Sequence, residues 1–319
     1  MRADLRVAAV GKPMTGVFRK QQMQFMERDD SLDSEFALAS SLERLNMGAH
    51  MNRIAERFLT MKARGHKGLV VYIGAGDPNL AATEQLAIAM DAGGVDILEL
   101  GVPFSDPLAD GLVNQLAAQR GLESGTTPRK VLETVASIRR RSQIPIILYI
   151  YFNLIHRIGM ERFFSEAANA GVDGLLILDL PPEESGNYER LMSENGLSVI
   201  YLIAPTTPDE RIQNIVPRGS GFVYYISREG VTGMRDTVAK SIAAMTQKIR
   251  AHTELPIAVG FGISNPDQAI QVAEHAEAVV VGSAIVHQIA EQGQDPNLVP
   301  KVSGFVQSLA EAVHGVRYH

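Results

Sequence analysis

The sequence predicts an α/β protein with a (β/α)8 TIM-barrel fold, preceded by a short extra N-terminal helix and carrying an extra helix after strand eight. From residue 68 onward, eight short runs rich in Val, Ile and Leu alternate with longer segments of helical periodicity. The runs are apolar nearly throughout, as is typical of parallel strands covered on both faces. Eight such β-then-α units in roughly 250 residues fit a barrel.

The expected strands are spread along the chain at 69–74, 96–101, 145–151, 174–179, 198–203, 221–226, 256–261 and 278–282. The expected helices lie between them, at 81–93, 128–141, 160–170, 183–195, 208–215, 235–252, 266–274 and 298–313. Three helices should start at a proline in the first helical position, in Thr127-Pro128, Thr207-Pro208 and Asn265-Pro266. Residues 283–290 supply the extra helix after strand eight.

A doubly wound open sheet is the alternative fold. It would need a Gly-rich fingerprint in the first βα turn, and Gly74-Ala75-Gly76-Asp77-Pro78 does not have the GxGxxG spacing. In a barrel, by contrast, the chemistry lies in the loops at the C-terminal ends of the strands. The unusual polar residues and glycines of this chain follow its strands at that end, so the barrel is the preferred prediction.

Residues 1–50 differ from the rest of the chain and are expected to be a poorly ordered leader or N-terminal extension. They show no clear periodicity, and no apolar stretch of sufficient length follows their basic beginning, so a secretory signal is not expected. An organelle-targeting segment is a weak alternative, and an upstream start codon or added leader is the preferred one. An amphipathic pattern begins at Met51, and residues 51–319 are expected to form the catalytic domain.

Composition excludes several classes of function. The net charge of −6 argues against a nucleic-acid groove or an anionic membrane surface as partner. The chain has no Cys, which removes the usual zinc spacings, a catalytic thiol and disulfides, and fits a reducing cytoplasm. No apolar run is long enough to span a bilayer. We therefore expect a cytoplasmic protein without a bound metal.

Two carboxylates frame the loop after the second strand and are the candidate catalytic residues. Glu99 lies inside an apolar strand, where burying its charge costs several kcal/mol unless the group is paired or used. Asp110 follows eleven positions later, after a loop rich in Pro, Ser and Asp. Such a pair suggests general acid/base chemistry. The alternative is a structural Glu99 that accepts hydrogen bonds from backbone amides.

Glycines after the last strands predict a phosphate site. Gly262, Gly282 and Ser283, with Gly233 from the sixth loop, would let backbone N–H groups approach an anion, and a helix starting at Ser283 adds its positive end. Barrels commonly bind phosphate at this place. Tight turns without a ligand are the alternative. Segment 227–235 has two glycines and suits a mobile lid, although a rigid loop could have the same sequence pattern.

Two aromatic residues and one leucine could line a substrate pocket. Tyr224 on the sixth strand either lies beside Glu99 or simply fills the barrel with its hydroxyl satisfied. Phe261 and Leu100 could form apolar walls around an aromatic substrate, or serve only the core.

The segment Leu98–Gly111, LELGVPFSDPLADG, resembles the signature of the tryptophan synthase α subunit family. The resemblance extends from about residue 51 to 315 through further motifs: Met51-Asn52-Arg53-Ile54, Gly76-Asp77-Pro78, Tyr151-Phe152-Asn153, Asp179-Leu180-Pro181, Ala204-Pro205-Thr206-Thr207-Pro208, Ser227-Arg228 with Gly230-Val231-Thr232-Gly233, Gly260-Phe261-Gly262-Ile263-Ser264 and Gly282-Ser283-Ala284-Ile285-Val286.

The resemblance implies retro-aldol cleavage of indole-3-glycerol phosphate to indole and glyceraldehyde 3-phosphate, without cofactor or metal. It assigns Glu99 as the acid/base at the indole ring carbon and Asp110 as the acceptor of the indole N–H. Thr232 would help to position Asp110, and Tyr224 would line the site. Gly233, Gly262, Gly282 and Ser283 match the phosphate-binding residues.

The resemblance also implies a partner, a pyridoxal-phosphate β subunit, in an αββα heterotetramer. Apolar and polar residues at the barrel mouth are expected in that interface: Pro103, Phe104, Pro107, Leu108 and Asn153. A stand-alone indole-releasing lyase and a catalytically silent activator of the β subunit are the alternatives. A phosphate-binding barrel with isomerase or epimerase chemistry is weaker, because the Glu-to-Asp loop does not suit it.

The chain departs from the family pattern in two loops and after Asp110. Leu112-Val113-Asn114 stands where the family usually has Pro, a β-branched residue and Ile. Gly74 replaces a usual Thr, and Glu229 stands where a small or neutral residue is commoner. These changes bear on the mobility of the loop and on coupling to a partner, and they leave both carboxylates intact.

Overall fold

The computed structural model describes residues 52–226 and 235–318. The predicted extension at 1–50 and nearly all of the predicted lid lie outside these residues, as do Thr232 and Gly233. The described residues belong to one compact unit. Within the described part, no helix is both long and apolar enough to cross a bilayer.

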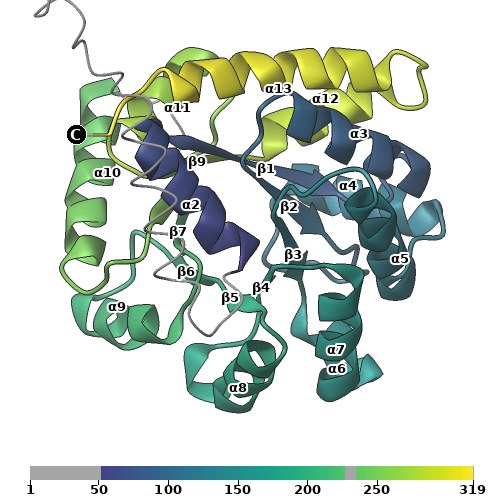
Figure 1. The fold of residues 1–319 in the computed structure, drawn as a ribbon, viewed down its shortest axis with the longest axis horizontal. Helices are drawn as coiled ribbons and strands as arrows, with labels where there is room; N and C mark the ends of the chain where they lie inside the picture. Colours follow the sequence, from purple (N-terminus) through teal and green to yellow (C-terminus); the bar gives the residue numbers. More distant parts are fainter. Residues whose placement is uncertain (1–51, 227–234, 319) are drawn as a thin grey trace, which may run out of the picture. The chain divides into compact units, whose positions relative to one another are not determined.

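The strands form one parallel sheet that closes into a barrel (Figure 1). In chain order they are β1 (Gly68–Gly74), β2 (Ile97–Gly101), β3 (Ile146–Ile150), β4 (Gly174–Ile177), β5 (Ser198–Val199), β6 (Tyr201–Ile203), β7 (Val223–Ile226), β8 (Ile257–Gly260) and β9 (Ala278–Val281). Their order in the sheet is β5-β4-β3-β2-β1-β9-β8-β7-β6.

The closure of the barrel depends on one strand that is divided in two. β5 and β6 flank Ile200 and together occupy the predicted fifth strand. β5 pairs with β4, whereas β6 pairs with β7, so the two halves join the ends of the sheet. The prediction of an eight-stranded barrel is thereby confirmed, and the open doubly wound sheet is excluded.

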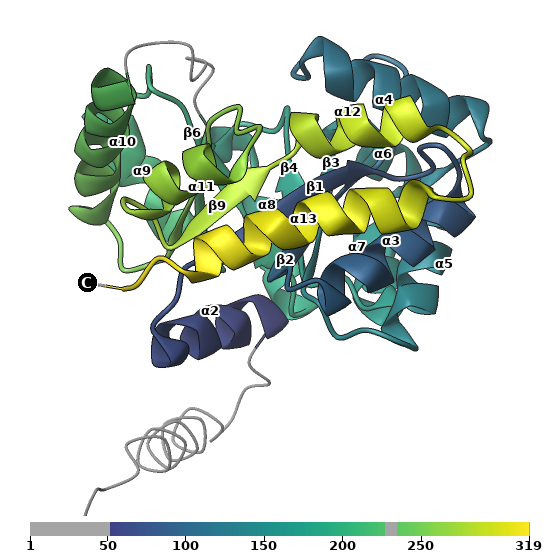
Figure 2. The ribbon, with the colours of Figure 1, turned by 90° about the horizontal axis from the view of Figure 1, so that it is seen from above.

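Helices surround the barrel (Figure 2). They are α2 (Arg53–Arg64), α3 (Leu80–Ala92), α4 (Leu112–Glu123), α5 (Pro128–Arg139), α6 (Phe152–Ile158), α7 (Met160–Ala170), α8 (Gly186–Glu194), α9 (Asp209–Ile215), α10 (Arg235–Arg250), α11 (Pro266–Ala273), α12 (Ser283–Gln292) and α13 (Leu298–His314), with short 3-10 turns η1 (Pro182–Glu184) and η2 (Val216–Arg218).

Most helix predictions are confirmed, with three differences. Neither α4 nor α6 was predicted, and the segment predicted at 183–195 is divided into η1 and α8. The predicted start at Thr207-Pro208 is wrong by one residue, because Pro208 is the N-cap and α9 begins at Asp209. The Thr207 hydroxyl instead accepts a hydrogen bond from the Ala204 amide at 3.0 Å. The predicted proline starts at Pro128 and Pro266 are confirmed.

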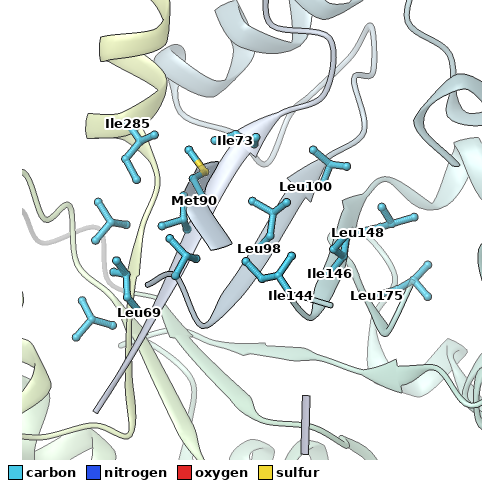
Figure 3. Packing of buried hydrophobic residues seen from close by; sticks show 14 of the residues in the cluster. Leu69, Ile73, Met90, Leu98, Leu100, Ile144, Ile146, Leu148, Leu175 and Ile285 are labelled. Carbon is cyan, nitrogen blue, oxygen red and sulfur yellow. The ribbon is translucent and has the colours of Figure 1, made fainter. Parts of the chain in front are cut away.

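The core has two layers separated by the strands. The outer layer packs outward-facing strand residues against the helices, and Figure 3 shows members of this cluster, among them Leu98 and Leu148 from strands, Met90 from α3 and Ile285 from α12. The inner layer fills the barrel with residues of alternate strand positions and is continued by α2. Phe58 of α2 meets Phe222 with ring centroids 5.7 Å apart. The short N-terminal helix therefore closes the end of the barrel at which the strands begin.

Carboxylates hold the strands together at this same end. Each of three acidic residues directly precedes a strand: Asp96, Asp173 and Glu277. Each accepts a hydrogen bond from a backbone amide near the start of the neighbouring strand, at 2.8, 2.8 and 2.9 Å. Each also pairs with cationic or imidazole groups, for instance Asp173 with two arginines at 2.8 and 2.7 Å. The beginning of the barrel is thus a structural end, and the opposite end is left for chemistry.

Candidate active site

Glu99 lies in the middle of β2, opposite Tyr72 of β1 and Ile147 of β3. Its side chain is 3% exposed, and no residue of the described chain donates a hydrogen bond to its carboxyl group. Burial, followed by the negative charge of Asp110, raises the pKa of Glu99 to about 8. The alternative of a carboxylate satisfied by backbone amides is not what the described residues form. At neutral pH, Glu99 therefore carries a proton that it can give away.

Asp110 lies at the end of the loop after β2, one residue before the Gly111 N-cap of α4. Its Oδ1 accepts a hydrogen bond from the Tyr149 hydroxyl at 2.7 Å, and its Oδ2 accepts one from the Tyr151 hydroxyl at 2.8 Å. Gln115 Nε2 donates to its backbone carbonyl at 3.0 Å. Hydrogen bonds from two tyrosines, which the sequence had not suggested, therefore set the orientation of this carboxylate.

Three tyrosines lie near the two acids: Tyr72 and Tyr224 are buried, and Tyr149 is half-buried. Burial raises the pKa of Tyr72, Tyr149 and Tyr224, and the negative charge of Glu99 adds to the shift at each. The Tyr72 and Tyr149 rings meet edge to face at 5.0 Å between centroids. A Cβ at Gly101 would overlap the Tyr72 ring, so this glycine of the signature is needed for packing. The three hydroxyls remain protonated at neutral pH and act as donors or acceptors without charge.

A small hollow opens beside the loop that carries Asp110. Its lining includes Tyr72, Gly101, Phe104, Asp110, Tyr149 and Tyr151. Glu99 and the predicted phosphate residues are not part of this lining. The structure thus brings Asp110 and the tyrosines around one cavity, with Glu99 buried next to it in the barrel wall.

Of the four predicted phosphate residues, the structure describes Gly262, Gly282 and Ser283, which follow the last two strands. Gly262 has a φ of +64°, and a Cβ added to it would meet no atom within 4 Å. Gly282 precedes α12, which begins at Ser283 as predicted. A Cβ at Gly282 would lie 3.3 Å from the Tyr72 Cβ, so this turn touches the tyrosine group. These positions are compatible with an anion held by backbone amides and a helix N-terminus.

The predicted wall residues lie in different layers of the core. Tyr224 faces the barrel interior, where burial and then the charge of Glu99 raise its pKa. Phe261 and Leu100 are both buried in the outer core, between strands and helices. A contact of Phe261 with substrate stays a prediction.

The predicted interface residues differ in exposure. Leu108 is 93% exposed and Asn153 is exposed, whereas Phe104 and Pro107 are half-buried. Pro103 is buried, and a Cβ at Gly121 of α4 would lie 3.3 Å from it. Two other exposed leucines, Leu112 and Leu116, lie in the first half of α4.

The departures from the family pattern gather around α4. Leu112 is exposed, while Val113 packs beside Tyr72, Ala117 and Val286. The Oδ1 atom of Asn114 is buried and lacks a hydrogen-bond partner in the described chain. A Cβ at Gly74 would come within 3.3 Å of the Ala117 Cβ, so the glycine lets α4 lie close to β1. Glu229 lies outside the described residues.

Comparisons with known proteins agree with this site. The family model of the tryptophan synthase alpha chain matches residues 58–314. The chain belongs to the tryptophan synthase alpha chain family. The alpha chain of Citrifermentans bemidjiense is 48% identical over 263 residues, which cover 82% of this chain and 98% of the relative. That of Geotalea daltonii is 49% identical over 263 residues, with 82% and 99% covered.

Solved structures of the family show the same fold. The alpha subunit from Legionella pneumophila superposes with a TM-score of 0.78 at 36% identity, covering 84% of this chain and all of the other. Ligand-free tryptophan synthase from M. tuberculosis gives 0.74 at 30% identity, with 82% and 99% covered. Family membership makes the chain a carbon–carbon lyase of tryptophan biosynthesis. Within residues 52–226 and 235–318, no group of three or more His, Cys, Asp or Glu could hold a metal ion.

Proposed function

We propose that Glu99 and Asp110 carry out the retro-aldol cleavage of indole-3-glycerol phosphate to indole and glyceraldehyde 3-phosphate. One observation carries the proposal: a buried carboxyl group, whose pKa is raised to about 8, lies near a second carboxylate that is held by two hydroxyl donors. These are the two groups that the reaction needs, because one must deliver a proton to carbon and the other must stabilise positive charge on nitrogen.

Each carboxyl group has a separate part in the reaction. Glu99 protonates the indole ring carbon that bears the side chain, and positive charge develops on the ring nitrogen. Asp110 accepts the N–H hydrogen bond and stabilises that charge. The Glu99 carboxylate then takes the proton of the adjacent hydroxyl, the carbon–carbon bond breaks, and its electrons return to the ring. The proton that was given is regained, so the step leaves indole, an aldehyde and a regenerated Glu99.

The remaining predicted residues would bind substrate without a cofactor or metal. Gly262, Gly282, Ser283 and Gly233 would hold the phosphate through backbone amides and the N-terminus of α12. Tyr224 would line the pocket beside Glu99, Phe261 would add an apolar wall, and Thr232 would help to position Asp110. Gly262 supports this assignment, because its open surroundings leave room for an anion against the backbone.

The family relationship supports a partner subunit. We propose that the chain binds a β subunit, which carries pyridoxal phosphate, in a cytoplasmic αββα heterotetramer that passes indole onward. The interface would include Phe104, Pro107, Leu108 and Asn153, with buried Pro103 supporting the loop from below. Leu112 and Leu116, in the first half of α4, would extend this apolar surface, as an interface core requires.

The test is indole formation from indole-3-glycerol phosphate, measured with and without the β subunit of the same host. Glu99→Gln should abolish nearly all cleavage, and Asp110→Asn should reduce it by about two to four orders of magnitude, while both variants stay folded. Substantial activity in Glu99→Gln would refute the assignment. Full activity without β subunit would favour a stand-alone lyase, and activation of the β subunit by an inactive chain would favour a silent partner.

A further inference from the structure

Tyr149 is a half-buried residue that contacts Asp110 directly, and the proposed mechanism gives it no part. Its hydroxyl donates to Asp110 Oδ1 at 2.7 Å. Tyr149 lies opposite Gly101 in the pairing of β2 with β3, and its ring packs edge to face against the Tyr72 ring. Because Tyr72 fixes the ring, the hydroxyl of Tyr149 points at a single carboxylate oxygen.

Tyr151 contacts the same carboxylate in a different way. Its hydroxyl donates to Asp110 Oδ2 and also accepts a hydrogen bond from the Ala109 amide at 3.0 Å. It therefore fixes the backbone of the loop as well as the side chain. In the described chain, the Tyr149 hydroxyl has Asp110 alone as its hydrogen-bond partner. Of the two tyrosines, Tyr149 acts on the carboxylate only.

We propose that Tyr149 is a positioning residue, whose hydroxyl holds Asp110 Oδ1 so that the carboxylate presents a free lone pair to the ring N–H of bound substrate. An ionised carboxylate offers about four acceptor sites, and the two tyrosines occupy two of them. The remaining sites are then fixed in direction before substrate arrives, which is the condition for electrostatic stabilisation without reorganisation. This inference rests on the proposed role of Asp110.

The chemistry of the Tyr149 hydroxyl suits this role. Burial, and then the charge of Asp110, raises the pKa of Tyr149, so the hydroxyl stays protonated and remains a donor. A hydrogen bond from a neutral donor to an ionised acceptor is stronger than one between neutral groups. The positive charge on the substrate ring exists only after protonation, so an oriented Asp110 acts mainly on the transition state.

The experiment is Tyr149→Phe in the full chain with saturating β subunit. We expect kcat for cleavage to fall about tenfold, equivalent to about 1.4 kcal/mol, with little change in KM. In the Asp110→Asn background the same substitution should cost nothing further, because the group through which Tyr149 acts has been changed. Tyr188→Phe on α8, which removes a hydroxyl outside the site, is the matched control and should leave kcat unchanged.

Other outcomes overturn the inference. An unchanged kcat in Tyr149→Phe, or an equal loss with and without Asp110, would show a purely structural role. A rise in kcat would show that the hydroxyl competes with substrate for Asp110. Tyr149→Met is a second variant for the case in which Phe does not fold, because it also keeps an apolar side chain there. If Asp110→Asn alone retains full activity, the proposed function fails, independently of Tyr149.

Discussion

Arg120 of α4 donates two hydrogen bonds of 2.8 Å to the two carboxylate oxygens of Asp77, which follows β1. Asp77 is 1% exposed, whereas the Arg120 side chain is 31% exposed. The pair joins the loop after the first strand to the helix after the second strand. The catalytic loop ends at the Gly111 N-cap of α4, so the pair ties the helix that follows this loop to the loop after β1.

We predict that Arg120→Met destabilises the protein more than Asp77→Asn. Removing the arginine leaves a buried charge without a partner, which typically costs about 3–5 kcal/mol. Removing the charge of Asp77 leaves an arginine that reaches water, and an amide that can still accept hydrogen bonds. Urea unfolding of both variants measures the difference. Equal losses would show that the pair contributes through packing rather than through its charges.

The barrel itself could be predicted from the sequence, but α4 could not, and the reason is physical. Its buried positions are Ala117 and Gly121, while leucines such as Leu112 and Leu116 point outward. The apolar periodicity therefore marks the wrong face. Its N-cap, Gly111, also makes no side-chain hydrogen bond. α6 was missed because it has only seven residues and no capping side chain.

The two acids of the site could be found from the sequence, because a glutamate in an apolar strand is conspicuous. Tyr149 and Tyr151 were missed as anchors of Asp110, since a tyrosine in a strand is common in any core. Their spacing of two residues, at the end of a strand neighbouring Glu99, was the available signal. The structural role of the buried Asp173 was also missed, because the loop Gly171-Val172-Asp173 at the other end of the barrel has no distinctive sequence pattern.

Glu99 should make stability depend on pH. Its pKa is about 8 in the fold and near 4.5 when unfolded, so between these values the unfolded chain loses a proton that the fold retains. Stability from this group is therefore lost as pH rises from 4.5 to 8. We predict that the free energy of unfolding of Glu99→Gln rises relative to that of the parent protein as the pH increases over this range. The difference should grow by up to about 1.4 kcal/mol per pH unit.

Urea unfolding at pH 5 and at pH 8 measures this gap between Glu99→Gln and the parent protein. Glu56→Gln, on the exposed side of α2, controls for the loss of one negative charge. A gap that is the same at both pH values would contradict a raised pKa of Glu99 in the fold.

Gly262→Ala should weaken binding of the phosphorylated substrate. The residue has a φ of +64°, so any side chain adds strain of about 1–2 kcal/mol, with or without a ligand. Gly196 has a φ of +71° and equally open surroundings, far from the proposed phosphate site in sequence, which makes Gly196→Ala the matched control. Both variants should lose similar stability.

Only Gly262→Ala should raise KM for indole-3-glycerol phosphate, by at least about tenfold. The added Cβ would keep the phosphate away from the backbone amide, and a hydrogen bond to a charged group would then be lost. Binding of unphosphorylated indole should change little in either variant, and titration calorimetry separates the two ligands. Similar KM values for the two alanine variants would mean that Gly262 only shapes the turn.

Leu108→Ser should weaken binding of the β subunit. Leu108 is 93% exposed and Leu112 of α4 is 70% exposed, so burying Leu108 against a partner is favourable. We predict low cleavage by the isolated chain, a marked rise with β subunit, and a reciprocal rise in β-subunit activity, because coupling between binding sites is mutual. Leu108→Ser should require at least about tenfold more β subunit for the same activation, equivalent to about 1.4 kcal/mol. Leu122→Ser, at the other end of α4, is the matched control. Sedimentation at micromolar concentration measures the complex directly, and unimpaired assembly of Leu108→Ser would place the interface elsewhere on the barrel.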